Sequence, residues 1–368
     1  MTKPIFNAPI NSVSFGFVGY QLLNQFYKSN IDFDFYPIGN GQQVLDFSSF
    51  NKAPEALKQL AERKSTNFHS SYSRKSPVVR LWHIGNSENT VGNGNHLLTF
   101  HELDSVTPSE VNVLNNQEQI FVTNKETKEV FESYGVKVPV TYLPLGYDTE
   151  HFHSTKKKYL GDKLIVTMIH GKYEPLRKNH EQLIKTWLRL YGNNPLHRLH
   201  LHIYNPFFNP EQNKNIAANL LEGKEYSNVN FFGYTKTLGE LNDSYNCATV
   251  VLDIGNEGWS LPSFHTTGLG KHSLLLNVAG LASWGNAENS VLIEPTGKKV
   301  AHDGVFFHQG APWNQGNFYS VDDDTVKNGL VELYQRVTKN RVNEAGLKLQ
   351  TQFTWENTFD ILRQKVGF

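Results

Sequence analysis

The chain has 368 residues, a length that suits two domains. Its 35 Lys and Arg residues equal its 35 Asp and Glu residues, so the net charge gives no argument for a nucleic-acid or membrane partner. A single cysteine, Cys247, excludes a disulfide framework, and no Cys/His spacing indicates structural zinc. No apolar run approaches the roughly 18 residues of a membrane span, and the N-terminus does not resemble a signal peptide. These features predict a soluble cytoplasmic protein.

The first half alternates apolar runs with helical patterns. A strand over 4–10, a small-residue loop and a helix with Val18, Leu22 and Phe26 on one face are typical of a mononucleotide-type α/β domain. Gly16 and Gly19 do not complete a dinucleotide fingerprint, and they suit either a tight turn or a loop that approaches a ligand. Further strands are expected over 31–39, 78–84, 96–101, 119–124 and 140–148, with a helix over 125–134.

Residues 51–80 are locally basic, with Ser and Tyr interleaved near their end. One interpretation is a solvated helix and loop. The other is a patch for an anionic acceptor such as DNA. The cations concerned are Lys52, Lys58, Arg63, Lys64, Arg74, Lys75 and Arg80.

The second half repeats the alternation after Lys156–Lys158 and Gly161, which resemble a linker. Asn179 is expected to cap a helix, and residues 296–317 form a long loop that is either a lid or a surface excursion. Alternating strands and helices predict an α/β fold with parallel sheets and right-handed crossovers. Strands are expected at 164–169, 199–204, 229–232, 249–253 and 273–278, and helices at about 211–222, 238–247, 322–338 and 341–349.

Charged residues follow two of these strands. Glu257 lies in the loop after 249–253, and a helix starting near Pro262 would present backbone N–H groups to an anion. The loop 171–178 carries Lys172, Arg177 and Lys178, while His101 and Glu102 follow a strand of the first half, on the opposite side of the expected cleft. Cations beside a carboxylate suit transfer of a sugar from a nucleotide diphosphate, because negative charge develops on the departing phosphate.

Several motifs resemble those of retaining GT-B glycosyltransferases of glycosyltransferase family 4 (glycosyl transferases group 1). Asn256-Glu-Gly-Trp-Ser-Leu-Pro262 with Gly268-Leu-Gly-Lys271 resembles the family's glutamate–glycine–aromatic–glycine–leucine–proline motif. His170-Gly-Lys172 with Arg177-Lys-Asn179 resembles its phosphate loop, with Lys172 in place of arginine. Other similar segments are Leu143-Pro-Leu-Gly-Tyr-Asp148, Phe231-Phe-Gly-Tyr234 and Phe353-Thr-Trp-Glu356.

The resemblance implies two Rossmann-like, doubly wound domains facing each other across a cleft. The first spans 1–155 and is completed by a C-terminal helix, at about 355–368, that crosses back to it; the second spans 160–352. It also implies retention without a covalent intermediate, no metal, no cofactor and a nucleotide-sugar donor. Catalytic roles are implied for His101, Lys178 and Glu257, and donor contacts for Lys172, Arg177, Gly258, Trp259, Ser260, Leu261 and His265.

Two positions depart from the family pattern. His265 stands where the family has a second glutamate, so donor contact and plain packing are both open for it. The first loop has Ser14-Phe-Gly-Phe17 in place of paired glycines. Other interpretations are a core histidine for His101, a helix-capping acid for Glu257, a solvated loop for Lys172 and Arg177, and core or cleft wall for Trp82 and Trp259. The expected acceptor side comprises Ser14, Gly16, Arg74, Lys75 and His83.

The acceptor is left open between a carbohydrate and DNA. The opening Asn7–Gly16 is similar to glycosyltransferases encoded by bacteriophages, which with the basic stretch points to hydroxymethylated pyrimidines in DNA and to the host cytoplasm. The alternatives from other classes are a Rossmann-type oxidoreductase, which the absent Gly-x-Gly-x-x-Gly disfavours, and an inactive sugar-nucleotide-binding protein.

Overall fold

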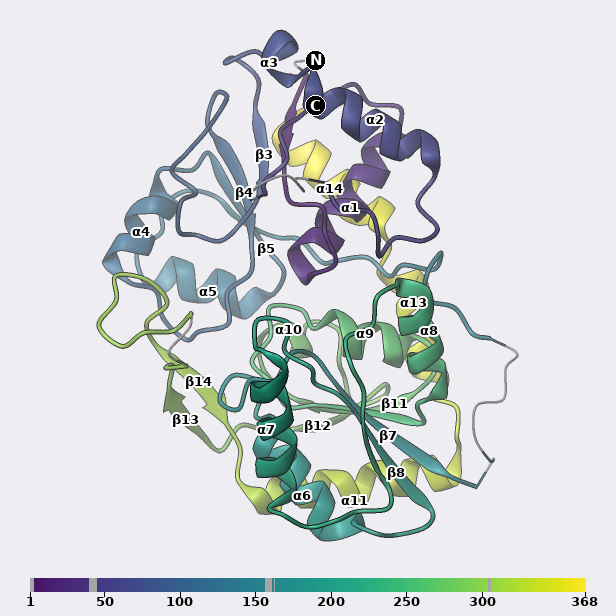
Figure 1. Ribbon diagram of the computed structural model, residues 1–368. Coiled ribbons are helices and arrows are strands. Elements are labelled where there is room, and N and C mark those ends of the chain that lie inside the picture. Colours follow the sequence, from purple (N-terminus) through teal and green to yellow (C-terminus); the bar gives the residue numbers. More distant parts are fainter. Residues whose placement is uncertain (1–2, 40–44, 156–160, 162, 304–305) are drawn as a thin grey trace.

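The computed structural model describes residues 3–39, 45–155, 161, 163–303 and 306–368. The predicted linker lysines therefore lie outside the described residues. Two six-stranded parallel sheets, one from each half of the chain, form two layered α/β units stacked one above the other in Figure 1. Within these ranges no helix combines the length and the apolar character that a bilayer span requires.

The first sheet has the strand order β2-β1-β3-β4-β5-β6. The predicted strand over 31–39 is only two residues long in the structure, because only Asp34 and Phe35 pair with β1. The strands are β1 (Ile5–Asn7), β2 (Asp34–Phe35), β3 (Val78–Leu81), β4 (Asn95–Thr99), β5 (Gln119–Val122) and β6 (Val140–Tyr142). The helices are α1 (Ser14–Lys28), α2 (Glu55–Thr66), α3 (Phe68–Ser71), α4 (Pro108–Asn115) and α5 (Lys125–Ser133).

The second sheet has the order β12-β11-β10-β7-β8-β9, which is the doubly wound order of dinucleotide-binding domains. Its strands are β7 (Ile165–His170), β8 (His197–His202), β9 (Val229–Phe231), β10 (Val250–Asp253), β11 (His272–Leu276) and β12 (Val291–Ile293). Its helices are α6 (His180–Tyr191), α7 (Pro210–Leu221), α8 (Leu238–Cys247), α9 (Leu261–Gly268), α10 (Ala279–Ala282) and α11 (Asp323–Lys339).

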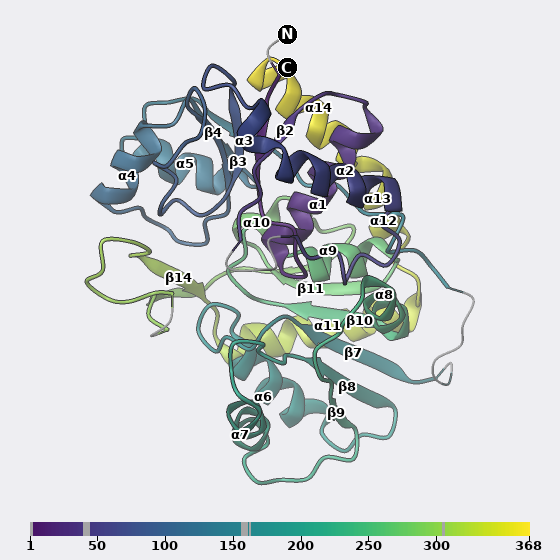
Figure 2. The same cartoon turned by 45° about the horizontal axis from the view of Figure 1, so that its top comes forward.

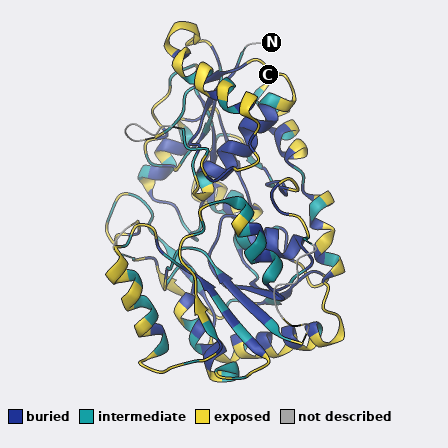
Figure 3. Ribbon diagram, turned by 45° about the vertical axis from the view of Figure 1, so that its right-hand side comes forward, coloured by how far each residue is buried: buried dark blue, intermediate teal, exposed yellow. Residues whose placement is uncertain are grey.

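Both sheets are buried between helices, as the apolar runs predict. All five residues of β11 are buried, and Figure 3 shows the strands mostly in dark blue while the outer helices carry exposed faces. The helix predicted over 341–349 is wrong in its bounds. The Asn343 side chain accepts a hydrogen bond from the Gly346 N–H and starts α12 (Glu344–Leu347), which is followed by the separate α13 (Leu349–Gln352).

The last helix, α14 (Trp355–Val366), returns to the first domain (Figure 2). It packs on α1, where the Phe26 ring lies 4.8 Å from that of Phe359 and 5.4 Å from that of Phe368. The Thr358 hydroxyl donates to the Pro144 carbonyl (2.7 Å). The predicted crossing of the C-terminal helix is therefore confirmed.

Gly146 marks the point where the chain touches the start of α14. A Cβ at this position would lie 2.2 Å from the backbone nitrogen of Trp355. We expect Gly146→Ala to lower the free energy of unfolding by about 2 kcal/mol or more, since the clash is with backbone. Urea denaturation measures this. Gly161→Ala is the matched control, because a Cβ there meets nothing within 4 Å; equal effects of the two substitutions would contradict the prediction.

A β-hairpin connects the two domains beside the cleft. Its strands, β13 (Gly297–Val300) and β14 (Asn317–Ser320), pair antiparallel, so the loop predicted over 296–317 is partly strand. We call residues 297–303 and 306–320 the strap. Lys298 forms an ion pair with Asp104 (2.8 Å), and the Thr107 hydroxyl donates to the Pro312 carbonyl (2.6 Å). Both bonds join the strap to the first domain, so this segment is not a free surface excursion.

Candidate active site

A cleft of about 740 Å³ separates the two domains at the carboxyl ends of both sheets. In the first sheet the order reverses between β1 and β3, and in the second between β7 and β10. Loops that follow these strands line the cleft, as expected for ligand sites of open α/β sheets. The lining comprises residues 12–15, 82–86 and 100–103 of the first domain, 170–172, 174, 177–178, 233–238 and 257–262 of the second, and 306–307 and 313–314 of the strap, among others.

The loops after β7 and β10 are joined by hydrogen bonds to backbone carbonyl groups. The Asn256 N–H donates to the Arg177 carbonyl (2.7 Å), and the Arg177 guanidinium donates to the Asn256 carbonyl (3.0 Å). Asn179 precedes α6 in the left-handed region (φ 51°), and its side-chain amide donates to the Ile254 carbonyl (2.8 Å). Asn179 occupies the N-cap position of α6, as predicted, but its side chain makes no capping hydrogen bond and instead holds the two loops together.

These loops carry a chain of ion pairs. The Lys178 ammonium contacts one oxygen of Glu257, and the Arg177 guanidinium lies 3.2 Å from the other. Arg177 also contacts Glu174, whose carboxylate lies 2.7 Å from the Lys172 ammonium. Only 11% of the Arg177 side chain, 12% of that of Lys178 and 11% of that of Glu257 is exposed. Buried charges of this kind are stable only when paired.

The pairing holds the carboxylates ionised. Burial by itself would raise the pKa of Glu174, but the charges of Arg177 and Lys178 lower it to about 2. Arg177 and Lys178 likewise outweigh burial and lower the pKa of Glu257. Glu174 was not singled out from the sequence. Its place between Lys172 and Arg177 in the chain was the available signal, because an acid within a cationic loop is positioned for ion pairing.

Lys172 extends toward the strap side of the cleft. Its ammonium lies 4.5 Å from the ring centre of Phe306 and 5.2 Å from that of Phe207, distances at which a cation is attracted to an aromatic face. Both rings are substantially exposed. An anion bound by Lys172 would therefore lie next to the strap.

The loop 257–260 lies against Gly280 at the start of α10. A Cβ on Gly280 would lie 2.3 Å from the carbonyl carbon of Gly258, so only glycine permits this approach. Ser260 is in the left-handed region (φ 62°), and Asp253 accepts hydrogen bonds from the hydroxyls of Ser260 and Ser263. Gly258, Ser260 and Leu261 line the cleft. Nothing local in the sequence indicates the Gly280 contact, because it joins separate elements.

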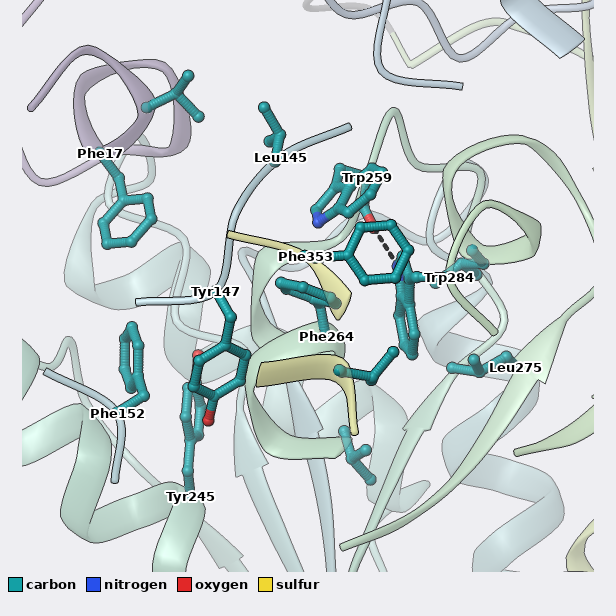
Figure 4. Close-up of a cluster of buried hydrophobic side chains, with 14 of the residues drawn as sticks. Phe17, Leu145, Tyr147, Phe152, Tyr245, Trp259, Phe264, Leu275, Trp284 and Phe353 are labelled. Atoms are coloured by element: carbon teal, nitrogen blue, oxygen red, sulfur yellow. Dashed lines mark hydrogen bonds between the residues drawn. The ribbon is translucent and has the colours of Figure 1, made fainter. Parts of the chain in front are cut away.

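Trp259 lies two residues after Glu257 in the chain, but its side chain packs in the buried aromatic cluster drawn in Figure 4. It is 2% exposed, and its ring lies 5.3 Å from that of Phe264 and 5.5 Å from that of Phe353. The Trp284 indole donates to the Trp259 carbonyl (2.8 Å). Trp259 therefore contributes to the cleft lining, but its ring is buried in the core below that lining.

His101 lies on the opposite wall and is 4% exposed. Its Nε2 is 2.9 Å from the Ser105 carbonyl. Because a carbonyl only accepts, Nε2 carries the proton and Nδ1 is left as an acceptor. Burial lowers the pKa of His101, with Glu110 acting in the opposite direction. Glu102, next in the chain, also lines the cleft, 3.8 Å from Arg177.

The structure does not bring His265 to the cleft lining. The ring is 1% exposed; its Nδ1 donates to the Leu261 carbonyl (2.8 Å), and its Nε2 accepts from the Asp148 N–H (3.4 Å). The ring packs 4.2 Å from that of Phe152 and 5.6 Å from that of Phe17. Of the two interpretations left open by the sequence, the geometry favours packing.

This environment predicts acid sensitivity. Burial lowers the pKa of His265 to about 4, against the charge of Asp148. Between the ordinary value near 6.5 and about 4 the unfolded chain binds a proton that the folded chain does not, so stability falls as pH falls, by about 1.4 kcal/mol per pH unit. We expect His265→Gln to reduce the difference in unfolding free energy between pH 7 and pH 5 by about 2 kcal/mol. Urea titrations measure it; exposed His69→Gln is the control, and an unchanged difference would refute the prediction.

The predicted acceptor-side residues divide into two groups. Ser14 and His83 line the cleft. Gly16 lies within α1, where a Cβ would meet Asn11 atoms at 2.1 Å, and it is not part of the lining. Arg74 and Lys75 lie between α3 and β3, at the amino edge of the sheet and so opposite the cleft (Figure 1). Within the described ranges, no group of three His, Cys, Asp or Glu side chains is arranged to hold a metal ion.

Solved structures with the same architecture cover the whole chain. Sucrose-phosphate synthase from Thermosynechococcus elongatus matches with a TM-score of 0.69 and 13% identity, over 99% of this chain and 98% of that one. A glycosyltransferase from Rickettsia africae ESF-5 matches with 0.66 and 10% identity, over 99% and 98%. HepE from Anabaena, in complex with UDP-glucose, matches with 0.61 and 11% identity, over 100% and 99%.

No protein-family model matches the sequence, and a search of curated proteins also finds no match. Identities of this size establish the fold and nothing finer. The prediction of a GT-B fold, with two Rossmann-like domains across a cleft, is therefore confirmed. Membership of glycosyltransferase family 4 and a bacteriophage origin stay predictions.

Proposed function

We propose that the protein is a glycosyltransferase that moves a sugar from a nucleotide-diphosphate sugar to an acceptor hydroxyl. The observation that carries this proposal is the meeting of Lys172, Arg177 and Lys178 with Glu257 at the topological switch point of the second sheet. Three cations, each held by a carboxylate in a cleft between two domains, suit a ligand that joins a diphosphate to a sugar.

In this proposal the second domain binds the donor. The diphosphate contacts Lys172, Lys178 and Arg177, and their paired carboxylates keep these side chains in place while the site is empty. Glu257 accepts hydrogen bonds from hydroxyls of the donor sugar. His101 lies on the opposite wall, and the Nδ1 of its neutral ring accepts a hydrogen bond from a further hydroxyl of the donor sugar.

The transfer step breaks the bond between the anomeric carbon and the phosphate oxygen, and the electron pair remains on the departing diphosphate. The cations stabilise that charge as it develops. The acceptor oxygen attacks from the face that the diphosphate leaves, which gives retention, and its proton passes to the leaving phosphate oxygen. No covalent glycosyl-enzyme is needed, and we propose that no metal is needed; unchanged turnover in EDTA would support the latter.

A thermal-shift panel tests the proposal. We expect a UDP, GDP, ADP or TDP species, or a sugar derivative of one of them, to raise the melting temperature, because a ligand of the folded state stabilises it by mass action. The same sugar nucleotide should release its diphosphate slowly in the presence of protein alone. A flat response across the panel would reject the proposal, and a response to nicotinamide dinucleotides alone would favour an oxidoreductase.

A further inference from the structure

The cleft wall of the first domain is aromatic. Phe15, at the start of α1, lies at the centre of a group of rings, 4.4 Å from that of His83, 4.8 Å from that of Phe100 and 6.1 Å from that of Trp82. All four residues line the cleft. Phe15, Trp82 and Phe100 are half-buried, and His83 is exposed. Trp313 of the strap lies beside this wall, 3.9 Å from the position that a Cβ on Gly85 would take.

The positively charged side chains of the cleft lie on its other wall, which the second domain forms. Each Lys or Arg among the described lining residues, namely Lys172, Arg177, Lys178 and Lys236, belongs to the second domain. The first domain contributes the carboxyl groups of Glu102 and Glu110 instead. Glu110 is occupied, because it accepts from the N–H groups of Thr107 (2.8 Å) and Asn314 (2.9 Å).

His83 does not supply a cation either. His83 is exposed to the cleft, but partial desolvation of its ring by the surrounding residues, followed by the nearby charge of Lys172, lowers the pKa of His83. The imidazole is therefore neutral near pH 7. The aromatic wall thus offers ring faces, the hydroxyl of Ser14 and the amide of Asn86, but no group that would pair with a phosphate.

The basic stretch 51–80 does not compensate for this. Arg80 donates to the side chain of Asn7 (2.7 Å) and to the carbonyls of Asn86 and Asn89 (both 3.1 Å). Lys64 pairs with Asp32 on the surface. Arg74 and Lys75 lie at the opposite edge of the sheet from the cleft.

We propose that the acceptor is an uncharged carbohydrate that binds with the apolar face of its ring on the wall formed by Phe15, Trp82 and His83. This inference rests on the proposed function and names its second substrate. Aromatic rings bind flat, partly apolar surfaces by dispersion, and the nearby hydroxyl and amide bond to sugar hydroxyls. A phosphorylated sugar or a DNA strand would place unpaired negative charge on a wall whose charged groups are carboxylates, whereas phosphate contacts dominate nucleic-acid affinity.

Acceptor competition tests the inference. The full chain is incubated with UDP-glucose, GDP-mannose or TDP-glucose and one of three acceptor classes: neutral mono- and disaccharides, their 6-phosphates, or duplex DNA containing 5-hydroxymethylcytosine. We expect transfer to a neutral sugar, at a rate that changes less than about twofold between 50 and 200 mM salt, where a phosphate-dependent complex would lose orders of magnitude. Preferred transfer to a 6-phosphate or to DNA would overturn the inference, as would hydrolysis of a donor without transfer to any neutral sugar.

Donor binding separates this outcome from the proposed function. A protein that binds or hydrolyses a sugar nucleotide but prefers a charged acceptor keeps the proposed function and loses the inference. A protein that binds no sugar nucleotide loses the proposed function itself.

Variants sharpen the test. Trp82→Ala is expected to raise the KM for the neutral acceptor about tenfold or more while the KM for the donor stays the same; Tyr134→Ala, an exposed aromatic outside the lining, is its control. Ser14 is exposed at the cleft, so Ser14→Arg adds a cation without burying it. We expect it to shift kcat/KM toward the 6-phosphate by about tenfold, and Ser70→Arg on α3 to cause no shift. Equal effects at cleft and control positions would refute the assignment of the wall.

Discussion

Replacing Lys178 with alanine is expected to lower kcat/KM for transfer about 100- to 1,000-fold, which is the usual effect of removing one group that stabilises charge in a transition state. Lys178 contacts Glu257 across the two loops and lies in the cleft with only 12% of its side chain exposed. Its ammonium would face the departing diphosphate where water is excluded, so its charge acts at low effective dielectric. Steady-state assays with a donor identified by thermal shift measure the effect.

The control for this variant is Lys185→Ala. Lys185 also forms ion pairs with carboxylates, Glu181 and Glu222, but it does so on the surface of α6, outside the cleft. The Lys185→Ala substitution removes the same charge and is expected to leave kcat/KM within about twofold of that of the unsubstituted protein. Circular dichroism and the melting temperature show whether each variant folds. A folded Lys178→Ala protein with unchanged turnover would reject the assignment of Lys178.

Substitution of Glu257 by glutamine should separate binding from turnover. In the empty site, Glu257 neutralises Lys178 and Arg177, and a diphosphate must compete with it for these cations. Glutamine removes the competing charge, so nucleoside diphosphates are expected to bind several-fold more tightly. Turnover is expected to fall about 100-fold or more, because the amide is a weaker acceptor for the donor sugar.

Calorimetric titration with the nucleoside diphosphate and steady-state kinetics give the two quantities independently. Glu288→Gln is the matched control, because Glu288 is exposed in the turn after α10 and does not line the cleft. A variant that loses nucleotide affinity and turnover together would indicate that Glu257 only maintains the loop. Unchanged turnover would remove it from the proposed mechanism.

Much of the donor side could be predicted from the sequence. Apolar runs bounded by polar loops are local patterns, and they located β7 and β10 and placed Lys178 and Glu257 at their carboxyl ends. Parallel strands bring their carboxyl ends to one edge, so both loops were expected at the same edge of the sheet. The pairing of β10 with β7, which makes the two loops adjacent, was decided by the fold. Local sequence patterns could not predict that Lys178 and Glu257 are buried and form an ion pair with each other.

The tertiary structure decided what depends on contacts between distant segments. His265 stands where the family pattern has a carboxylate, yet whether it meets a ligand depends on Phe17 and Phe152 of the other domain, which cover it. The sequence predicted the strap to be a loop. The contacts that order it, the pairing of β13 with β14 and the ion pair of Lys298 with Asp104, join residues far apart in the chain, so no local pattern indicated them.

The acceptor side shows the same division most clearly. The sequence by itself determined that residues 51–80 are basic, that Ser14 follows the first strand and that His83 lies near the carboxyl end of a later strand. Only the fold decided that Arg74 and Lys75 face away from the cleft while the rings of Phe15, Trp82 and His83 come together in it. The physical reason is that composition gives the charge of a segment, whereas the direction that the charge faces is set by which edge of the sheet the segment occupies.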